Sequence, residues 1–208
     1  MATNAFVEIN IEEAAHLADL TGIVHDFERT KHFAEQLKEM IEGGIHPVHE
    51  PMTIAILIRY SRPFVSGVRY HLNERDLEEL SPEQRAAHDG FILWRNKHIA
   101  HSVNVFEENQ PVARYWVERF DSEGFSSVEC NSTELAGMSL YDVEMVMELT
   151  THFIEKLKPR LKCEKKKVLE IVQSLKREDV LVIAKPASVS NMKDVGKVRK
   201  QRSRQHGQ

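Results

Sequence analysis

The chain has 208 residues, of which 41% are hydrophobic and 29% are charged. These proportions are typical of a globular protein with one apolar core, and they exclude a wholly disordered or collagen-like chain. No apolar run is longer than five residues (IAILI, 54–58, is one of this length), far shorter than the roughly 20 residues that a membrane helix needs, so we expect no transmembrane segment.

Cysteine content and the N-terminal sequence bear on the compartment. Cys130 and Cys163 are too few for a disulfide framework or a cysteine-rich zinc site. The first eight residues (MATNAFVE) lack the basic and apolar regions of a secretion signal. We therefore expect a cytoplasmic protein with reduced thiols.

Charge is distributed unevenly. The formal net charge is −4, but segment 185–208 contains seven basic residues and one acid, so it carries +6 and leaves −10 on the remainder. An acidic body with a basic tail suggests that the tail contacts a polyanion.

Four helices are predicted in the N-terminal part. Each is indicated by apolar residues at three- and four-residue spacing, by dense charges, or by both. They cover 9–21, 23–41, 52–66 and 73–80. Gly43 and Gly44 are expected to end the second helix, and Pro63 to bend or end the third. Segment 45–51 contains two prolines and is predicted to be a loop.

A well-marked helix start follows at Ser81. Ser81 can cap the helix, Pro82 suits its first position, and Gln84 completes a capping box. We expect this helix to continue to about residue 103. Strand-forming residues then flank the sequence DSEG, so the segment 112–130 is predicted to form a β-hairpin.

The C-terminal part begins with the most regular helix, predicted over 139–158 and ended or bent at Pro159. A further charged helix is expected over 163–184. The sequence thus predicts a mainly α protein, with a single helical domain over 1–184 and a β-hairpin insertion at about 112–130. The composition of 185–208 predicts a disordered basic tail.

Segment 91–102 (FILWRNKHIAHS) carries the clearest chemistry. At 100° per residue, Phe91, Trp94, His98 and His101 share one narrow stripe of a helix, and Arg95 lies on its shoulder. Burying a guanidinium and two imidazoles costs free energy unless they are paired. The combination therefore suits a functional site better than a core.

The order of Arg95, Asn96 and His101, with five residues between the arginine and the histidine, resembles the Rx4-6H motif of HEPN domains. The wording KHIAHS is similar to the HEPN group associated with abortive infection and toxin–antitoxin loci. The upstream sequence from Arg62 to Arg69 (RPFVSGVR) also resembles a stretch that precedes the motif. The resemblance is closest over 88–107 and extends over 50–160.

The resemblance implies a four- or five-helix bundle that forms a homodimer, with the motif helices meeting across the two-fold axis. It implies a metal-independent endoribonuclease of the toxin or phage-defence kind, with RNA as substrate, a 2',3'-cyclic phosphate as product, and an antitoxin or other protein partner. No metal or cofactor is expected. Because other HEPN domains are not catalytic, the alternative is an interaction module that binds RNA or a partner protein.

These residues suit RNA cleavage chemically. Histidine titrates near pH 6.5 and can move protons, and arginine grips phosphate through two donors. The resemblance assigns His101 as acid or base and Arg95 as phosphate clamp, with Asn96 orienting the phosphate or a neighbouring histidine. His98 is an assisting candidate, and Lys97 a flanking cation.

Several of these residues also have a purely structural explanation. Arg95 and His101 can instead cap helix carbonyls and pair with acids, and packing of His98 against Trp94 is favoured over catalysis. Arg62 and Arg69 either line an RNA groove or mark a solvated helix end.

Two further features have both a binding and a non-binding interpretation. The tail either grips phosphate or serves as a solubilising terminus. Its candidate RNA-binding residues are Lys197, Arg199, Lys200, Arg202 and Arg204. A metal site at His46, His49, His88 and His98 is the less favoured explanation of these histidines, because no cysteine or acidic pair completes it in sequence.

Overall fold

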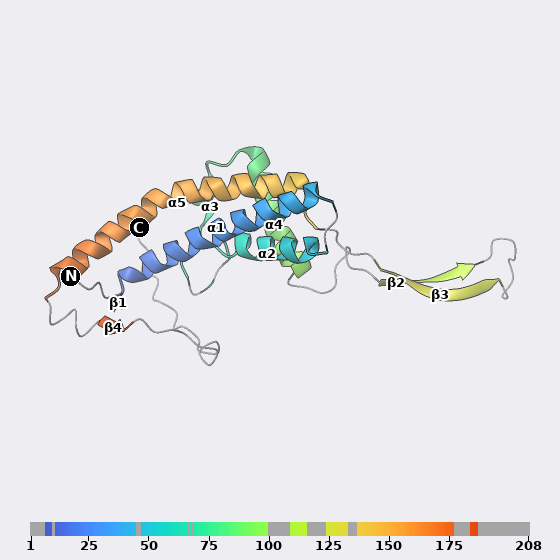
Figure 1. Cartoon of the computed structure of the whole chain (residues 1–208), viewed down its shortest axis with the longest axis horizontal. Helices are drawn as coiled ribbons and strands as arrows, with labels where there is room; N and C mark the ends of the chain where they lie inside the picture. Colours follow the sequence, from blue (N-terminus) through green and yellow to red (C-terminus); the bar gives the residue numbers. More distant parts are fainter. Residues whose placement is uncertain are drawn as a thin grey trace. The chain divides into compact units, whose positions relative to one another are not determined.

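The computed structural model describes residues 7–9, 11–44, 47–65, 67, 69–99, 109–115, 124–132, 137–176 and 184–186. Within these ranges the protein is mainly α, with five α-helices, a π-helical turn and two two-stranded antiparallel sheets (Figure 1). The chain divides into two units. Unit 1 comprises Met1–Arg29, Arg62–Glu79 and Thr150–Gln208, and unit 2 comprises Thr30–Ser61 and Leu80–Leu149.

Helix α1 (Ala14–Glu42) is continuous, so the prediction of two helices over 9–21 and 23–41 is wrong. Gly22 separates the predicted ranges, but it lies inside the helix. A Cβ at this position would lie 3.0 Å from Nη1 of Arg69, so the glycine admits a close approach of that guanidinium. The predicted stop is confirmed, because Gly43 follows the helix and Gly44 adopts a φ of 109°.

Unit 1 is built around stacked aromatic rings. Phe27 from α1 stacks on Phe153 with ring centroids 5.0 Å apart, and Phe64 packs edge-on against Phe153 at 5.3 Å. Leu20 and Leu157 complete this core and are almost fully buried. The apolar positions that predicted helices in the sequence thus converge on one core in this unit.

A short helix, α3 (Glu74–Leu77), packs in the same unit through polar contacts. Asn73 caps it, with a capping box completed by Asp76. Arg160, on the long C-terminal helix α5 (Leu140–Ser174), donates to Asp76 at 2.7 Å and to the Tyr70 hydroxyl at 2.8 Å. The guanidinium therefore ties the connection before α3 to the long C-terminal helix.

Helix α5 (Leu140–Ser174) continues through Pro159, so the predicted end at this proline and the separate helix over 163–184 are wrong, whereas the alternative of a bend at Pro159 stays a prediction. A proline inside a helix removes one N–H and crowds the carbonyl four residues earlier. Here both Pro159 and Glu155 are exposed, so water can satisfy the carbonyl that loses its donor.

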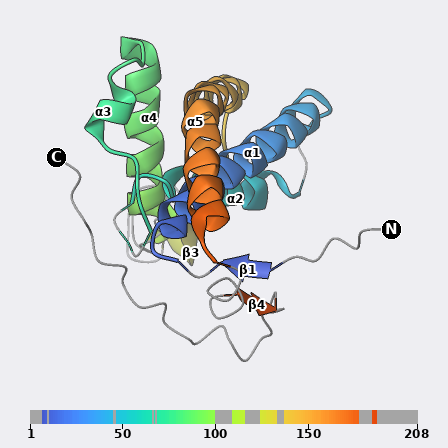
Figure 2. The same cartoon turned by 90° about the vertical axis from the view of Figure 1, so that its left-hand side faces the viewer.

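Strand β1 (Val7–Ile9) pairs antiparallel with β4 (Ala184–Pro186), which the sequence did not predict (Figure 2). Two residues of the predicted tail, 185 and 186, therefore belong to a strand. The remaining tail residues, 187–208, lie outside the described ranges, as do its RNA-binding candidates.

Unit 2 contains α2 (His49–Ser61) and α4 (Pro82–Trp94), together with the adjoining parts of α1 and α5. Helix α2 begins at His49, inside the predicted loop 45–51, because Pro51 occupies the first helical turn, where proline is tolerated. It ends at Ser61, two residues before Pro63, so the predicted end near this proline is confirmed and the predicted extension to residue 66 is wrong. Its buried residues include Ile56, Leu57 and Tyr60.

The segment before α5 docks on α2 through Gly137 and Met138. Gly137 has a φ of 97°, and a Cβ there would lie 2.9 Å from His49 Cδ2. The backbone N–H of Met138 donates to Thr53 Oγ1 at 3.0 Å. Only glycine fits both the backbone conformation and the space at position 137.

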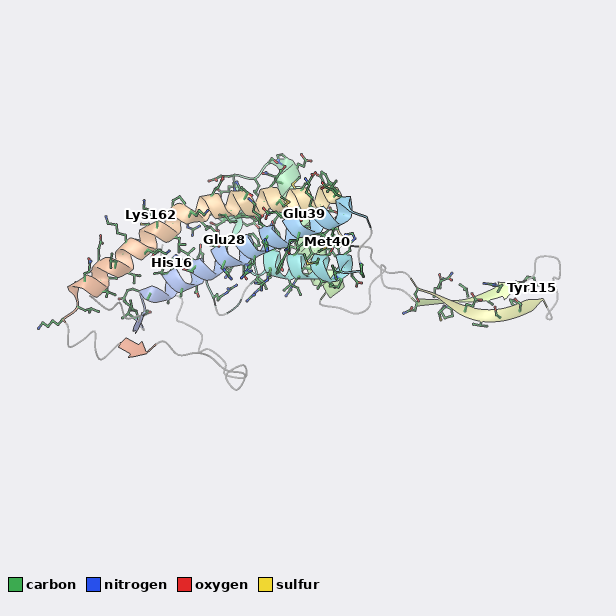
Figure 3. All side chains as sticks on the ribbon, in the orientation of Figure 1. His16, Glu28, Glu39, Met40, Tyr115 and Lys162 are labelled. Carbon is green, nitrogen blue, oxygen red and sulfur yellow. The ribbon has the colours of Figure 1, made fainter. Side chains whose placement is uncertain are left out.

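The predicted hairpin is confirmed by strands β2 (Asn109–Tyr115) and β3 (Phe125–Ser132), which pair antiparallel. Tyr115, labelled in Figure 3, packs edge-on against Phe125 with centroids 4.5 Å apart. All of β3 is exposed, including the apolar Val128. Across the described ranges, no helix is both long and apolar enough to cross a membrane.

Candidate functional site

Helix α4 directly precedes the motif. A capping box at its N-terminus and contacts of its buried face with α2 hold it in place. The predicted capping box is present: Gln84 N donates to Ser81 Oγ at 3.1 Å, and Ser81 N donates to Gln84 Oε1 at 3.2 Å. His88 and Phe91 are the buried residues of the helix. Both meet Tyr60 of α2, which hydrogen-bonds His88 Nδ1 at 2.9 Å and packs edge-on against the Phe91 ring.

The Tyr60 hydroxyl is a neutral buried anchor. Burial, together with the negative charge of Asp89, raises its pKa well above the ordinary value of 10.0. The hydroxyl therefore stays protonated in the folded protein and keeps its hydrogen bond to His88 at neutral pH. This contact fixes α4 on α2 two turns before Arg95.

Replacing Tyr60 by phenylalanine is expected to lower the free energy of unfolding by about 1–3 kcal/mol at neutral pH, because the buried His88 Nδ1 loses this partner. Above about pH 10 the unfolded tyrosine ionises while the folded one does not. The wild type then loses about 1.4 kcal/mol per pH unit at this residue, whereas the Tyr60→Phe variant has no group that titrates there. Urea denaturation at increasing alkaline pH should show that the difference in free energy of unfolding between the wild type and Tyr60→Phe becomes smaller. A difference that stays constant would contradict this.

Immediately after α4 the helix widens into a π-helical turn, Arg95–Ile99, which lies against α2. The backbone N–H of Arg95 donates to both Phe91 O and Ile92 O, four and three residues earlier, which is a bifurcated bond of the kind common at the end of an α-helix. The α-helix was predicted to reach about residue 103, but it ends at Trp94. A wider turn does not keep 100° per residue, so the helical wheel does not apply through Arg95–Ile99. The predicted common stripe of Phe91, Trp94, His98 and His101 stays a prediction, because His101 and the side chain of His98 lie outside the described residues.

The π-helical turn coincides with the predicted site residues. The guanidinium of Arg95 donates from Nη1 to Asn96 Oδ1 at 3.0 Å, so these two predicted residues are in contact. Arg95 is half-buried, whereas Asn96 and Lys97 are exposed. The side chain of His98 and all of His101 lie outside the described residues.

This arrangement presents a cation held by a neutral partner. An asparagine oxygen accepts one guanidinium N–H without neutralising the charge. Among the described residues Asn96 is the only partner of the Arg95 side chain, so its other donors can bind an oxyanion. π-Helical turns occur often at functional sites, since they aim side chains in directions that a regular helix does not allow. The turn can therefore serve as an anion-binding corner.

Arg62 and Arg69 are placed differently from the motif, in unit 1. Both pair with Asp26 of α1: Arg62 Nη1 lies 3.3 Å from Oδ1, and Arg69 Nη2 lies 3.0 Å from Oδ2. Asp26 is only 3% exposed, so its carboxylate needs compensating charge. Structural pairing therefore accounts for part of the charge of both arginines, and their RNA-groove role stays a prediction.

The histidines considered as metal ligands are dispersed. His49 Nε2 donates to the Met138 carbonyl at 2.9 Å, since a carbonyl oxygen only accepts. His88 bonds Tyr60, and His46 is not among the described residues. Among the side chains that the structure describes, no three histidines, cysteines or acids are grouped so as to hold a metal ion.

Sequence reasoning missed Tyr60 and Asp26. Tyr60 closes the apolar run that starts at Met52, and a hydroxyl at that point signals a buried polar contact. Asp26 lies between Ile23 and Phe27 on the apolar side of α1, where a carboxylate requires a cationic partner. Both signals are present in the sequence, but neither identifies the partner.

Comparison of the chain with protein-family models, with curated proteins and with solved structures found no match.

Proposed function

We propose that the protein is a cytoplasmic, metal-independent endoribonuclease of the toxin or phage-defence kind, with a HEPN-like motif formed by Arg95, Asn96 and His101. The observation that carries the proposal is the Arg95–Asn96 contact on a π-helical turn, at the end of a helix that has a capping box and a buried face. The half-buried guanidinium has donors left for a phosphate, and the motif histidine follows six residues later in the sequence.

In the proposed reaction, the 2'-oxygen of RNA attacks the adjacent phosphorus and the bond from phosphorus to the 5'-oxygen breaks. One His101 imidazole accepts the proton of the 2'-hydroxyl, and a second, protonated imidazole gives a proton to the leaving 5'-oxygen. Arg95 stabilises the charge that builds on the phosphorane. The products are a 2',3'-cyclic phosphate and a 5'-hydroxyl.

The need for a base and an acid at one phosphate supports a homodimer. Each chain contributes one motif, so two copies that meet at their motifs supply two histidines and two arginines. A protein antitoxin or another protein partner that covers this site would restrain the activity.

The test is RNA cleavage by the purified protein in excess EDTA, with the wild type compared with His101→Ala. We expect the wild type to cleave, to leave 2',3'-cyclic phosphate ends, and the variant to lose at least about a hundredfold in rate. Cleavage that requires a divalent metal, or that survives in the variant, would refute the proposed mechanism.

A matched variant separates catalysis from structure. His71→Ala removes a histidine from outside the motif and should leave the cleavage rate unchanged. If neither protein cleaves, and Arg95→Ala lowers dimer stability when measured by sedimentation, the interaction-module alternative replaces the nuclease.

A further inference from the structure

The C-terminal half of α5 has a lysine-rich side. Lys158, Lys162, Lys165 and Lys166 follow the i, i+4, i+7, i+8 spacing that places residues on one side of a helix, and all four are exposed. We call these four residues the lysine face. At 1.5 Å per residue it extends about 12 Å along the axis. Lys162 is labelled on α5 in Figure 3.

The lysine face is poorly compensated by the protein. Within the described part of the chain, Lys158, Lys162 and Lys165 form no ion pair, and Lys166 lies 3.7 Å from Glu170 while its side chain is 79% exposed. In contrast, Lys167 points to the opposite side of the helix and pairs with Glu164 at 2.7 Å. Lys167 on one side of α5 is thus paired closely, whereas three of the four lysines of the lysine face have no ion pair among the described residues.

This pattern opposes helix stability. Like charges at i, i+4 repel, and the lysine face contains two such pairs, Lys158 with Lys162 and Lys162 with Lys166. Bound anions would relieve the repulsion among these lysines, and a ligand with regularly spaced negative charges fits their regular spacing. A nucleic-acid strand presents such charges in its phosphates, and lysine contacts them without regard to base sequence.

A membrane surface is a poorer match. A helix that lies in a bilayer interface needs a free apolar side to insert. The apolar side of this part of α5 is already used, because Leu157 and Val168 are buried in unit 1. Among the large apolar residues that the structure describes in this part of α5, only Leu169 is exposed.

We propose that the lysine face of α5 binds the phosphodiester backbone of a single-stranded nucleic acid. The surface belongs to unit 1 and the motif to unit 2, so this binding does not depend on the cleavage chemistry proposed above. It identifies a sequence-independent contact that the motif alone does not supply.

The experiment measures binding of a labelled single-stranded RNA, and of DNA with the same sequence, by fluorescence anisotropy over a range of salt concentrations. All proteins are full-length and carry His101→Ala, so that cleavage cannot consume the probe. Lys162→Gln/Lys165→Gln removes two charges from the lysine face. The control, Lys38→Gln/Lys167→Gln, removes two lysines that each lie 2.7 Å from a glutamate oxygen.

Each lost phosphate contact should reduce the slope of log K against log salt by about 0.7, so the lysine-face variant should lose about 1.4 in slope. This corresponds to binding weakened about 25-fold at about 0.1 M salt, for RNA and DNA alike, with the control close to the parent. The basic tail is present in every protein, so its contribution cancels.

Equal losses in the two variants would show an effect of total charge only and overturn the proposal. An unchanged lysine-face variant would also overturn it. Loss of binding to anionic phospholipid vesicles, with nucleic-acid binding retained, would assign the surface to a membrane instead. Cleavage by the wild type is measured separately, so each of these results leaves the nuclease proposal intact.

Discussion

Replacing Arg62 and Arg69 together by glutamine is expected to lower the free energy of unfolding by about 3 kcal/mol. Both guanidinium groups pair with Asp26, whose side chain is only 5% exposed while theirs are 49% and 32% exposed. Removal of the cations leaves a buried carboxylate without these two partners, and such broken pairs typically cost about 3–5 kcal/mol. We expect the lower end, because the arginines are partly hydrated. Urea denaturation followed by circular dichroism measures the loss.

A third substitution tests the cause. Adding Asp26→Asn to the double variant removes the buried charge, so the triple variant should recover a large part of the lost stability. Arg85→Gln is a matched control, because Arg85 pairs with the exposed Asp89 and should cost less than about 1 kcal/mol. A triple variant that is no more stable than the double variant would show that charge burial is not the reason.

The same variants separate two roles for these arginines. If Arg62 and Arg69 line an RNA groove, the triple variant should bind RNA more weakly even though its fold is largely restored. If they serve only to compensate Asp26, the triple variant should bind as the wild type does. The stability measurement and the binding measurement thus answer different questions about the same two residues.

Local signals predicted the parts of the fold that depend on local chemistry. The capping box of Ser81 and Gln84 requires only residues three apart, and it is present. The hairpin depends on strand-forming residues around a short turn, and it is present as well. The predictions failed where packing overrides a local signal. Pro159 lies inside α5 at a position where both it and Glu155 are exposed, and sequence periodicity does not reveal that the helix continues there.

The candidate site was predictable in composition and less so in geometry. The motif order of Arg95 and Asn96 identified a pair that proves to be in contact. The helical wheel assumed 3.6 residues per turn, and the π-helical turn breaks that assumption at the residues where it mattered. No local pattern in a single sequence distinguishes this turn from the end of an ordinary helix.

Arg95→Ala is expected to reduce kcat/KM for RNA cleavage by at least about 10³-fold, with the larger part of the loss in kcat. An arginine that holds the phosphate and stabilises the further charge that develops in the transition state contributes most to kcat, and removal of such a group typically costs about 10³–10⁵. Arg95 is half-buried with one donor bound to Asn96. Its loss should leave the fold intact, which the circular dichroism spectrum and the unfolding midpoint will check.

Two further variants distinguish a clamp from a simple cation. Arg95→Lys keeps the charge but loses the planar pair of donors, so it should recover only a small part of the rate. Asn96→Ala removes the oxygen that holds the guanidinium, and the resulting misplacement should cost up to about a hundredfold. If lysine restores full activity, Arg95 acts through charge alone. If Arg95→Ala cleaves at the wild-type rate, the motif arginine has no part in the reaction, and the proposed site is wrong.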